Sequence, residues 1–295
     1  MALPTASSIT DKLPRFLRRH KLMTCWMALT GEDPVQPVRI RDDIFALADM
    51  SDGFLRLIVI DKQYDEDFFA LGDALLAGGG TFLDVGANFG LLSFGLAGKH
   101  GSTIDFHLFE PNIRLVNTIA RSQKRFPQMR CKVNAVAVSD RPGTVNFHIN
   151  EGQTGASHIA EEGGVEVQVV TLDDYIAAAA LADVTLLKLD VEGFELNALR
   201  GAERSLRERT INAVYFEYFE KYLIRAGPPQ QVIDFLDSVG FATTFCRSCD
   251  YDPHGGPTHT LAGTGVRLLP VGDFARPPMT DLLAVPRDHL VPVAT

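Results

Sequence analysis

The chain has 295 residues, of which 46% are hydrophobic and 22% are charged, and this composition excludes a disordered or low-complexity protein. The formal net charge of −9 argues against nucleic acid as the main partner, because phosphate binding needs a cationic surface. Four cysteines are too few for a disulfide framework at this length, so the cytoplasm is the expected location.

The N-terminal region is predicted to be an extension of the main domain. Basic residues within 15–21 precede the apolar stretch 22–29, a pattern that loosely copies a signal peptide. The stretch is short and is broken by Thr24, so an amphipathic helix is favoured over a signal or a contact with a membrane surface. Short strands are expected at 38–40, 44–45 and 54–60. We therefore divide the chain into an extension with a helix and short strands, 1–62, and a domain, 63–295.

From residue 63 onward, helical and extended patterns alternate along the chain. The expected elements are, in chain order, helix 65–76, strand 81–85, helix 89–97, strand 104–109, helix 113–126, strands 131–138, 144–149 and 165–170, helix 172–180, strand 184–190, helix 196–207, strand 213–218, helix 229–239, and strands 241–245 and 281–285. This alternation predicts a parallel sheet with helices on both faces. The carboxyl ends of such strands share one edge, where ligands bind.

The first strand of this series leads into the segment 84–90, DVGANFG. Gly86 and Gly90 let the backbone turn tightly and approach a ligand, because they carry no Cβ. The loop feeds a helix N-terminus, whose free N–H groups can bind a carboxylate or a polar cofactor tail. Asp84 could bind a cofactor ammonium or orient the loop. The spacing is not that of the dinucleotide fingerprint, which counts against a nicotinamide oxidoreductase.

Acidic residues lie at or just after the carboxyl ends of three of the predicted strands. Glu110 is placed to accept both ribose hydroxyls of an adenosine, although an acid beside Pro111 is also an ordinary helix start. Asp190 and Glu217 are expected at the same edge, where they suit hydroxyl binding, a general base or a cation site. Glu192 and Glu195 lie next to Asp190, and their alternative role is to stabilise the N-terminus of the next helix.

A further group of polar residues lies in two loops. Cys246, Cys249, His254 and His259 approach the spacing of a small zinc site, but a loop with scattered polar groups is favoured and no metal site is predicted. The two histidines of this group are candidates to face a substrate, and so is His158, which follows a Gly-Ala-Ser segment.

The segment 82–90, taken with other motifs in the same order, resembles the FkbM-type methyltransferases. The further motifs are 109–111, 137–140, 171–174, 188–195 and 199–202. The resemblance implies a class I methyltransferase fold, which is a Rossmann-like α/β fold with a seven-stranded, mostly parallel sheet, helices on both faces and an antiparallel last strand. It also implies S-adenosylmethionine as the methyl donor and O-methylation of a small molecule such as a polyketide, a sugar or a carboxylic acid, as in natural-product biosynthesis.

The resemblance also assigns roles by position. The residues that would line the methionine end of the cofactor are Asp84, Gly86, Ala87, Asn88 and Gly90. Glu110 would hold the ribose, and the segment from Asn134 to Ala137 would pass near the adenine. Asp190 and Glu217 would face the transferred methyl, with Asp190 as the general base and His158 or His254 as rivals.

The expected function is therefore an S-adenosylmethionine-dependent O-methyltransferase that acts on a hydroxyl or carboxylate of a small molecule. A non-catalytic scaffold of the same fold is the first alternative, and the intact acidic set argues against it. An oxidoreductase with a nucleotide cofactor is the second, and it lacks its fingerprint. The expected partner is a small-molecule acceptor, without nucleic acid or stable membrane insertion, and a homo-oligomer is compatible with the sequence.

Overall fold

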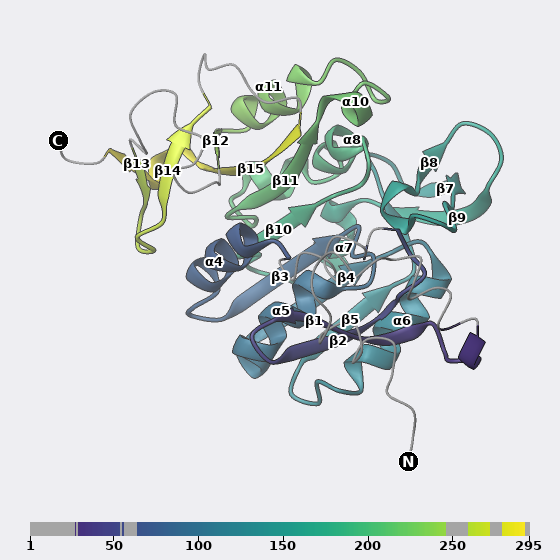
Figure 1. Ribbon diagram of the computed structural model, residues 1–295. Coiled ribbons are helices and arrows are strands. Elements are labelled where there is room, and N and C mark those ends of the chain that lie inside the picture. Colours follow the sequence, from purple (N-terminus) through teal and green to yellow (C-terminus); the bar gives the residue numbers. More distant parts are fainter. Residues whose placement is uncertain are drawn as a thin grey trace.

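A ten-stranded mixed sheet runs through the protein (Figure 1). The structure is a computed structural model that describes residues 27, 29–53, 55, 64–245, 259–271 and 279–292. Five parallel strands form the centre of the sheet, in the order β5 (Arg130–Asn134), β4 (Ile104–Phe109), β3 (Gly80–Val85), β10 (Leu186–Leu189) and β11 (Val214–Phe219). The carboxyl ends of these five strands therefore lie along one edge, as predicted.

Beyond β11 the sheet becomes antiparallel. β15 (Met279–Pro286) pairs antiparallel with β11 on one side and with β12 (Phe241–Phe245) on the other. Three short strands, β14 (Arg267–Pro270), β13 (His259–Leu261) and β16 (Leu290–Pro292), extend the edge next to β12. The prediction of seven strands is therefore wrong by three, because strands of three or four residues leave too little periodicity to be recognised.

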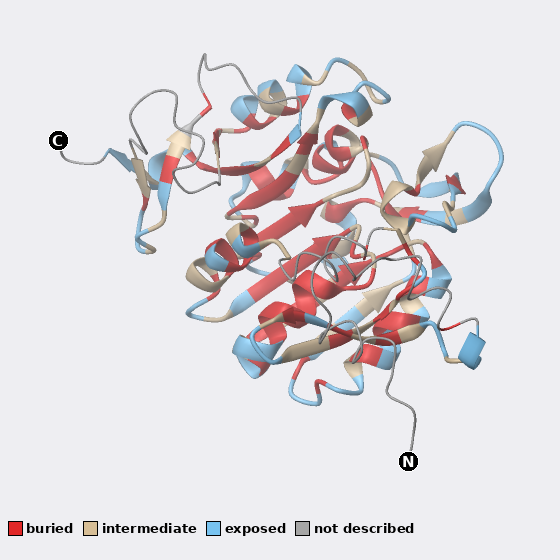
Figure 2. Ribbon diagram, viewed as in Figure 1, coloured by how far each residue is buried: buried red, intermediate tan, exposed pale blue. Residues whose placement is uncertain are grey.

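Helices cover both faces of the sheet. One face carries α4 (Glu66–Leu75), α5 (Leu91–His100) and α6 (Ile113–Gln123), and the other carries α7 (Leu172–Ala178), α8 (Glu195–Arg200), α9 (Glu203–Arg207) and α11 (Gln230–Ser238). The strands supply alternate side chains to the two layers, so that Phe82 joins one hydrophobic core and Leu83 the other. Figure 2 shows the central strands as the most buried part of the molecule. The prediction of an α/β fold with helices on both faces is confirmed.

An N-terminal hairpin packs against the first of these layers. It consists of β1 (Val35–Arg41) and β2 (Ile44–Asp49), and its buried side chains belong to the same core as α5 and α6. The Arg41 guanidinium donates two hydrogen bonds to Asp73 on α4. Most of the predicted strand at 54–60 and most of the predicted N-terminal helix lie outside the described residues; of that strand Leu55 is described, and it is not in a strand. The division at residue 62 stays a prediction.

A second, four-stranded sheet projects from the main body (Figure 1). Its order is β6 (Ala137–Val138), β9 (Val165–Val170), β7 (Gly143–His148) and β8 (His158–Ala160), and we call residues 143–170 the ribbon. The single strand predicted at 131–138 is therefore wrong. Its first half, β5, pairs with β4, whereas its second half, β6, turns away to pair with β9.

The helix predicted at 196–207 is interrupted at Gly201. The Gly201 carbonyl accepts a hydrogen bond from the backbone N–H of Asp173, and a Cβ at Gly201 would lie 2.1 Å from the carbonyl oxygen of Ser139. The tight contact with a neighbouring segment separates α8 from α9. The remaining short elements are α10 (Glu220–Leu223), η2 (Gly101–Thr103), η3 (Thr154–Ala156) and η4 (Arg287–His289). Of the helices in the described ranges, none is both long and apolar enough to cross a membrane.

Candidate active site

A pocket opens at the carboxyl ends of β3, β4 and β10. Its walls come from the loop after β3, from residues 109–111 after β4, from 136–138, from 190–192 after β10, and from the ribbon. The predicted ligand edge and the observed pocket therefore coincide.

The loop after β3 is held in a conformation that needs glycine at its first turn. Gly86 has a φ of +76°, and a Cβ there would lie 1.8 Å from the carbonyl oxygen of Asp190. The N–H groups of Gly86 and Ala87 both donate to the carbonyl of Phe109, at 3.0 Å. Because these donors are used by the protein, the loop lies fixed between β4 and the segment after β10.

Other residues of this loop divide between lining the pocket and supporting it. Asn88 lines the pocket, as Gly86 does, and its backbone has a positive φ of 52°. Ala87 and Gly90 do not line it: both are packed behind the loop, where a Cβ on Gly90 would contact Phe94, Ile119 and Leu108. The prediction that Ala87 and Gly90 line the cofactor is therefore corrected to a supporting role.

Glu110 lines the pocket at the end of β4 and is almost fully buried. Its Oε2 accepts a hydrogen bond of 2.8 Å from the N–H of Asn88, and its Oε1 accepts one of 2.9 Å from the N–H of Asn112. Burial raises the pKa of this carboxyl to about 7, against the effect of the two backbone donors. A carboxylate oxygen accepts more than one hydrogen bond, so Glu110 retains acceptor capacity for a ligand hydroxyl.

Asp84 supports the loop from below. It is almost completely buried and does not line the pocket; its Oδ2 accepts a 2.6 Å hydrogen bond from Ser93 on α5, and its Oδ1 lies 3.3 Å from Nζ of Lys188. Direct binding of a cofactor ammonium is therefore not the role that this geometry supports. Of the two roles predicted for Asp84, orienting the loop fits the structure.

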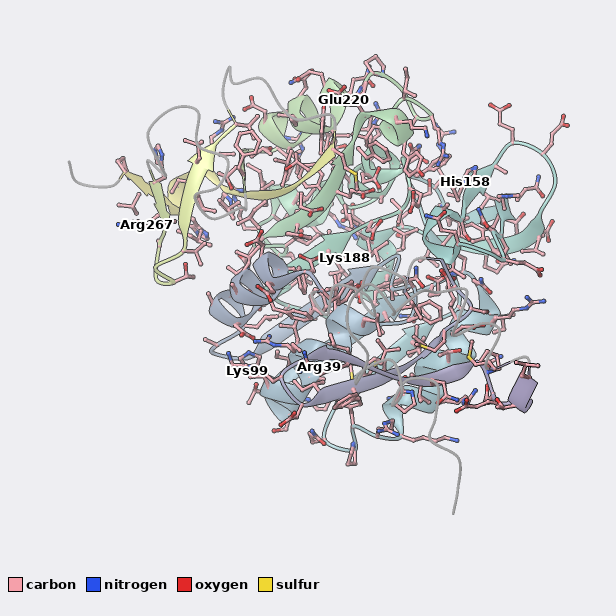
Figure 3. The ribbon with its side chains drawn as sticks, viewed as in Figure 1. Arg39, Lys99, His158, Lys188, Glu220 and Arg267 are labelled. Atoms are coloured by element: carbon pink, nitrogen blue, oxygen red, sulfur yellow. The ribbon has the colours of Figure 1, made fainter. Side chains whose placement is uncertain are left out.

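Lys188 connects the loop after β3 (residues 84–90), which we call the cofactor loop, to residues 190–195 after β10, which we call the acidic segment. Sequence analysis assigned Lys188 no role. Figure 3 shows this side chain near the middle of the molecule, and it is 4% exposed. Its Nζ donates a 2.7 Å hydrogen bond to the carbonyl of Gly86 and lies 3.4 Å from Oδ2 of Asp190. Burial alone would lower the pKa of Lys188, but the negative charges of Asp84 and Asp190 outweigh it and raise that pKa. The sequence did contain a signal for such a role, because a lysine between Leu187 and Leu189 in a buried strand needs partners for its charge.

The acidic residues after β10 and on β11 form one electrostatic group. Asp190 lines the pocket, and its side chain is 43% exposed. Glu192 also lines it, and burial together with the charges of Asp190 and Glu217 raises its pKa to about 9. Glu217 is half-buried opposite Asp281 of β15, and burial, Asp190 and Asp281 raise its pKa to about 8. Glu217 lies near Asp190 but is not part of the pocket wall.

Glu195 has the structural role that sequence analysis gave as its alternative. It is almost fully buried, and its Oε1 accepts hydrogen bonds from the N–H groups of Val191 and Gly193, at 3.0 and 3.3 Å. Burial raises its pKa to about 7. The residue thus fixes the turn that presents Asp190 and Glu192 to the pocket.

His158 is corrected from catalytic candidate to a residue on the other side of the ribbon. Ser157 and Ile159 line the pocket, and because side chains alternate along a strand, His158 points to the opposite face. Figure 3 labels His158 on the ribbon. Its Nδ1 is 3.0 Å from the carbonyl oxygen of Ala156, and its ring lies beside that of His148.

Asn134 is likewise turned away from the pocket. Its side-chain amide donates to the carbonyl of Leu108 and to the hydroxyl of Tyr175, at 3.0 and 3.2 Å. The lining at this point comes from Ala137 with Val136 and Val138, which form an apolar surface. The prediction for Ala137 fits this position, and that for the Asn134 side chain does not.

The ribbon forms a further wall and is tied to two separate segments. Thr154 donates a hydrogen bond from Oγ1 to Oδ1 of Asn88, and its N–H donates to Oδ2 of Asp52. The N–H of Gly53 donates to the carbonyl of Gly152. Sequence analysis missed these contacts, because they join residues far apart in the chain.

The four residues whose spacing approaches that of a zinc site are only partly described by the structure. Cys246, Cys249 and His254 lie outside the described residues, and His259 lies on β13, between β14 and β16. Within the ranges that the structure describes, no three His, Cys, Asp or Glu side chains are grouped so that they could hold a metal ion.

Residues 84–253, more than half of the chain, match the family model described as the methyltransferase FkbM domain. The chain belongs to the FkbM methyltransferase family. It therefore carries a methyltransferase domain, and membership of the family implies S-adenosylmethionine as the methyl donor. The matched range begins at Asp84 and includes the cofactor loop, Glu110, Lys188 and Asp190.

Two curated relatives are similar to this FkbM methyltransferase at low identity. The 2-O-methyltransferase NoeI of Sinorhizobium fredii is 27% identical over 165 residues, which cover 49% of this chain and 66% of the relative. The hexuronic acid methyltransferase AglP of Haloferax volcanii is 24% identical over 166 residues, which cover 56% of this chain and 64% of the relative. The match thus spans just under two thirds of each relative. An O-methyltransferase structure from Thermotoga maritima is 12% identical, with a TM-score of 0.38, over 88% of this chain and 80% of that one.

Proposed function

We propose that this FkbM methyltransferase transfers a methyl group from S-adenosylmethionine to a hydroxyl oxygen of a small-molecule acceptor. The observation that carries the proposal is the position of Asp190. Its side chain lines the pocket and is partly exposed, and its backbone carbonyl lies against Gly86 of the loop after β3. A base at that position can take the proton of an acceptor hydroxyl.

The residues of the pocket fit the donor. Glu110 can accept hydrogen bonds from ribose hydroxyls, and the apolar surface of Val136, Ala137 and Val138 suits an adenine ring. The loop of Gly86 and Asn88 would surround the methionine end. The bound donor supplies a methyl that is already activated on a sulfonium, so the protein must chiefly position the acceptor and remove its proton.

The charge around Asp190 favours a hydroxyl acceptor over a carboxylate. Burial and mutual repulsion already raise the pKa values of Glu192 and Glu217. An acceptor carboxylate at this place would lie beside the Asp190 carboxylate and would be repelled by it. A neutral hydroxyl adds none, and its proton can pass to Asp190 as the oxygen–carbon bond forms and the sulfur–carbon bond breaks. The relatives' names cover a 2-O-methyltransferase and a hexuronic acid methyltransferase, so both acceptor classes belong in the test.

The proposal is tested by turnover with isotope-labelled donor on matched acceptors. Methyl glucoside and methyl glucuronide form one such pair, because they differ in one carboxylate, and hydroxylated polyketides extend the panel. We expect methylation of neutral hydroxyl compounds and a lower rate on each carboxylated partner. Methylation confined to the carboxylates would overturn the hydroxyl assignment.

Asp190→Asn tests the base. We expect S-adenosylhomocysteine to bind as it does to the wild type, while turnover falls by about 100- to 10,000-fold. Asp105→Asn is a matched control, because Asp105 pairs with Arg130 on the surface of β4. Full turnover by Asp190→Asn would remove Asp190 from the chemistry. Calorimetry with NAD in place of S-adenosylhomocysteine tests the oxidoreductase alternative, because that alternative requires the protein to bind NAD.

A further inference from the structure

We infer that Lys188 is a positioning residue that selects Asp190, among the clustered carboxyl groups, as the ionised one and ties it to the cofactor loop. The inference rests on the proposed role of Asp190 as the base. It adds the reason why Asp190, and not Glu192 or Glu217, would serve. Lys188 itself is buried behind the loop and is not part of the pocket wall.

The register of the central strands sets the contacts of Lys188. Lys188 on β10 lies directly beside Asp84 on β3, and its side chain reaches past the end of β3 to the carbonyl of Gly86. At the same Nζ, Asp84 and Asp190 are 3.3 and 3.4 Å away. The ammonium group therefore donates a hydrogen bond to the Gly86 carbonyl and lies at ion-pair distance from two carboxylates, one on β3 and one after β10.

The charged groups around Lys188 come from every neighbouring element. Asp65 at the start of α4, Asp84 on β3, Glu110 after β4, Glu217 on β11 and Asp190 after β10 all interact electrostatically with it. Of these, Asp84 and Asp190 lie within ion-pair distance. Asp84 is fully buried and is also bound by Ser93, so it has no access to an acceptor. Asp190 is the one carboxylate that combines direct contact with Lys188 and exposure to the pocket.

Glu192 and Glu217 differ from Asp190 in their protonation. The pKa values of Glu192 and Glu217 are raised to about 9 and about 8, so these side chains hold their protons near neutral pH. A protonated carboxyl cannot act as a base, but it can donate a hydrogen bond. Asp190 is thus the pocket acid that forms an ion pair with Lys188, and Glu192 and Glu217 are the acids whose pKa values are raised.

Lys188 also fixes where Asp190 lies. The N–H of Asp190 donates to the carbonyl of Val85, and its own carbonyl contacts Gly86. These backbone contacts hold the main chain, whereas the Lys188 ammonium holds the carboxylate. Loss of Lys188 would leave the side chain free to rotate and would remove the hydrogen bond to the Gly86 carbonyl on the donor's side of the pocket.

The alternative is that Lys188 only neutralises the buried charge of Asp84. Lys188→Met alone would leave that carboxylate buried without its cation, which is strongly destabilising. The double variant Asp84→Asn with Lys188→Met removes both charges together, so it tests the effect on Asp190 without the unpaired acid. Lys188→Arg keeps the positive charge. Lys99→Met is the control, because Lys99 pairs with Asp73 at the surface, away from this site (Figure 3).

The measurement is an NMR pH titration of isotope-labelled aspartate carboxyl groups in the protein without acceptor. The Asp190 resonance is the one absent from Asp190→Asn. Relative to Asp84→Asn alone, we expect the midpoint of this resonance in the double variant to lie at higher pH by about one unit or more, because a cation at this distance favours the ionised form by that amount. Lys188→Arg and Lys99→Met should keep the wild-type midpoint. Calorimetry with S-adenosylhomocysteine should show weaker binding by the double variant.

Equal midpoints in the double variant and in Asp84→Asn alone would overturn the inference, as would a shift in Lys188→Arg as large as the one expected for the double variant. These outcomes are separate from failure of the proposed function. If Asp190→Asn turned over acceptors normally, the role of Asp190 as base would fail while the titration result would stand. If Asp190→Asn lost turnover and the titration did not move, Asp190 would be the base and Lys188 would not control it.

Discussion

Replacing Gly86 with alanine tests how tightly the cofactor loop is held against the acidic segment. Gly86 has a φ of +76°, which costs an L-residue about 1–2 kcal/mol. The new Cβ would also lie 1.8 Å from the Asp190 carbonyl oxygen, so that one of the two backbones must move. Overpacking of this kind typically costs a further 1–3 kcal/mol, roughly. We therefore expect Gly86→Ala to lower the free energy of unfolding by about 2–5 kcal/mol.

Gly163 provides a matched control for the backbone contribution. It also has a φ of +76°, but no atom lies within 4 Å of a Cβ placed there. Urea denaturation should therefore show a loss of about 1–2 kcal/mol for Gly163→Ala, which is the cost of the backbone conformation alone. Calorimetry should show weaker binding of S-adenosylhomocysteine by Gly86→Ala and unchanged binding by Gly163→Ala. Equal stability and equal affinity of the two variants would refute the contact between Gly86 and Asp190.

Three further predictions concern pH. Burial raises the pKa of Glu110 to about 7, and a hydrogen bond from a ligand hydroxyl favours the ionised form of this carboxyl. The affinity for S-adenosylhomocysteine, measured by calorimetry, should therefore rise with pH up to about 7 and then stay constant. Glu110→Gln should not show this pH dependence. Although burial raises it, hydrogen bonds from Arg41 and its neighbours lower the pKa of Asp73 to about 2. The contribution of Asp73 to stability is therefore present above about pH 4 and lost as the pH falls through 2. In acid denaturation, Asp73→Asn should not show this loss of stability. The pKa of Glu217 is raised from 4.5 to about 8, so its contribution to stability is present below pH 4.5 and lost as the pH rises through 8. Between these pH values the melting temperature of Glu217→Gln should fall less than that of the wild type.

The order of the main strands and helices was predictable because buried parallel strands leave continuous apolar runs. Residues 213–216 are an example, and they are followed by the acidic residue Glu217. Gly86 and Glu110 were also found from sequence, because a positive φ and an acid after the second strand have local signatures. The short strands β13 and β16 have no such signature, since three residues show no period.

The direction of individual side chains could not be predicted, because it depends on pairing between distant segments. His158 faces away from the pocket because its neighbours Ser157 and Ile159 face it, and one residue of register reverses that arrangement. The amide of Asn134 is used by Tyr175, which lies 41 residues further along the chain. Lys188 meets Asp84 only because β10 pairs with β3 in one particular register.

The link between Thr154 and Asp52 has a consequence for how long a product stays bound. Asp52 contacts the ribbon and precedes the part of the chain that matches the family domain. A hydrogen bond of this kind contributes about 1 kcal/mol, which corresponds to roughly five-fold in a rate of opening. Two members of the family with identical pockets would therefore release S-adenosylhomocysteine at different speeds if they differed at this one position. Turnover can in this way diverge among relatives through residues that touch neither cofactor nor acceptor.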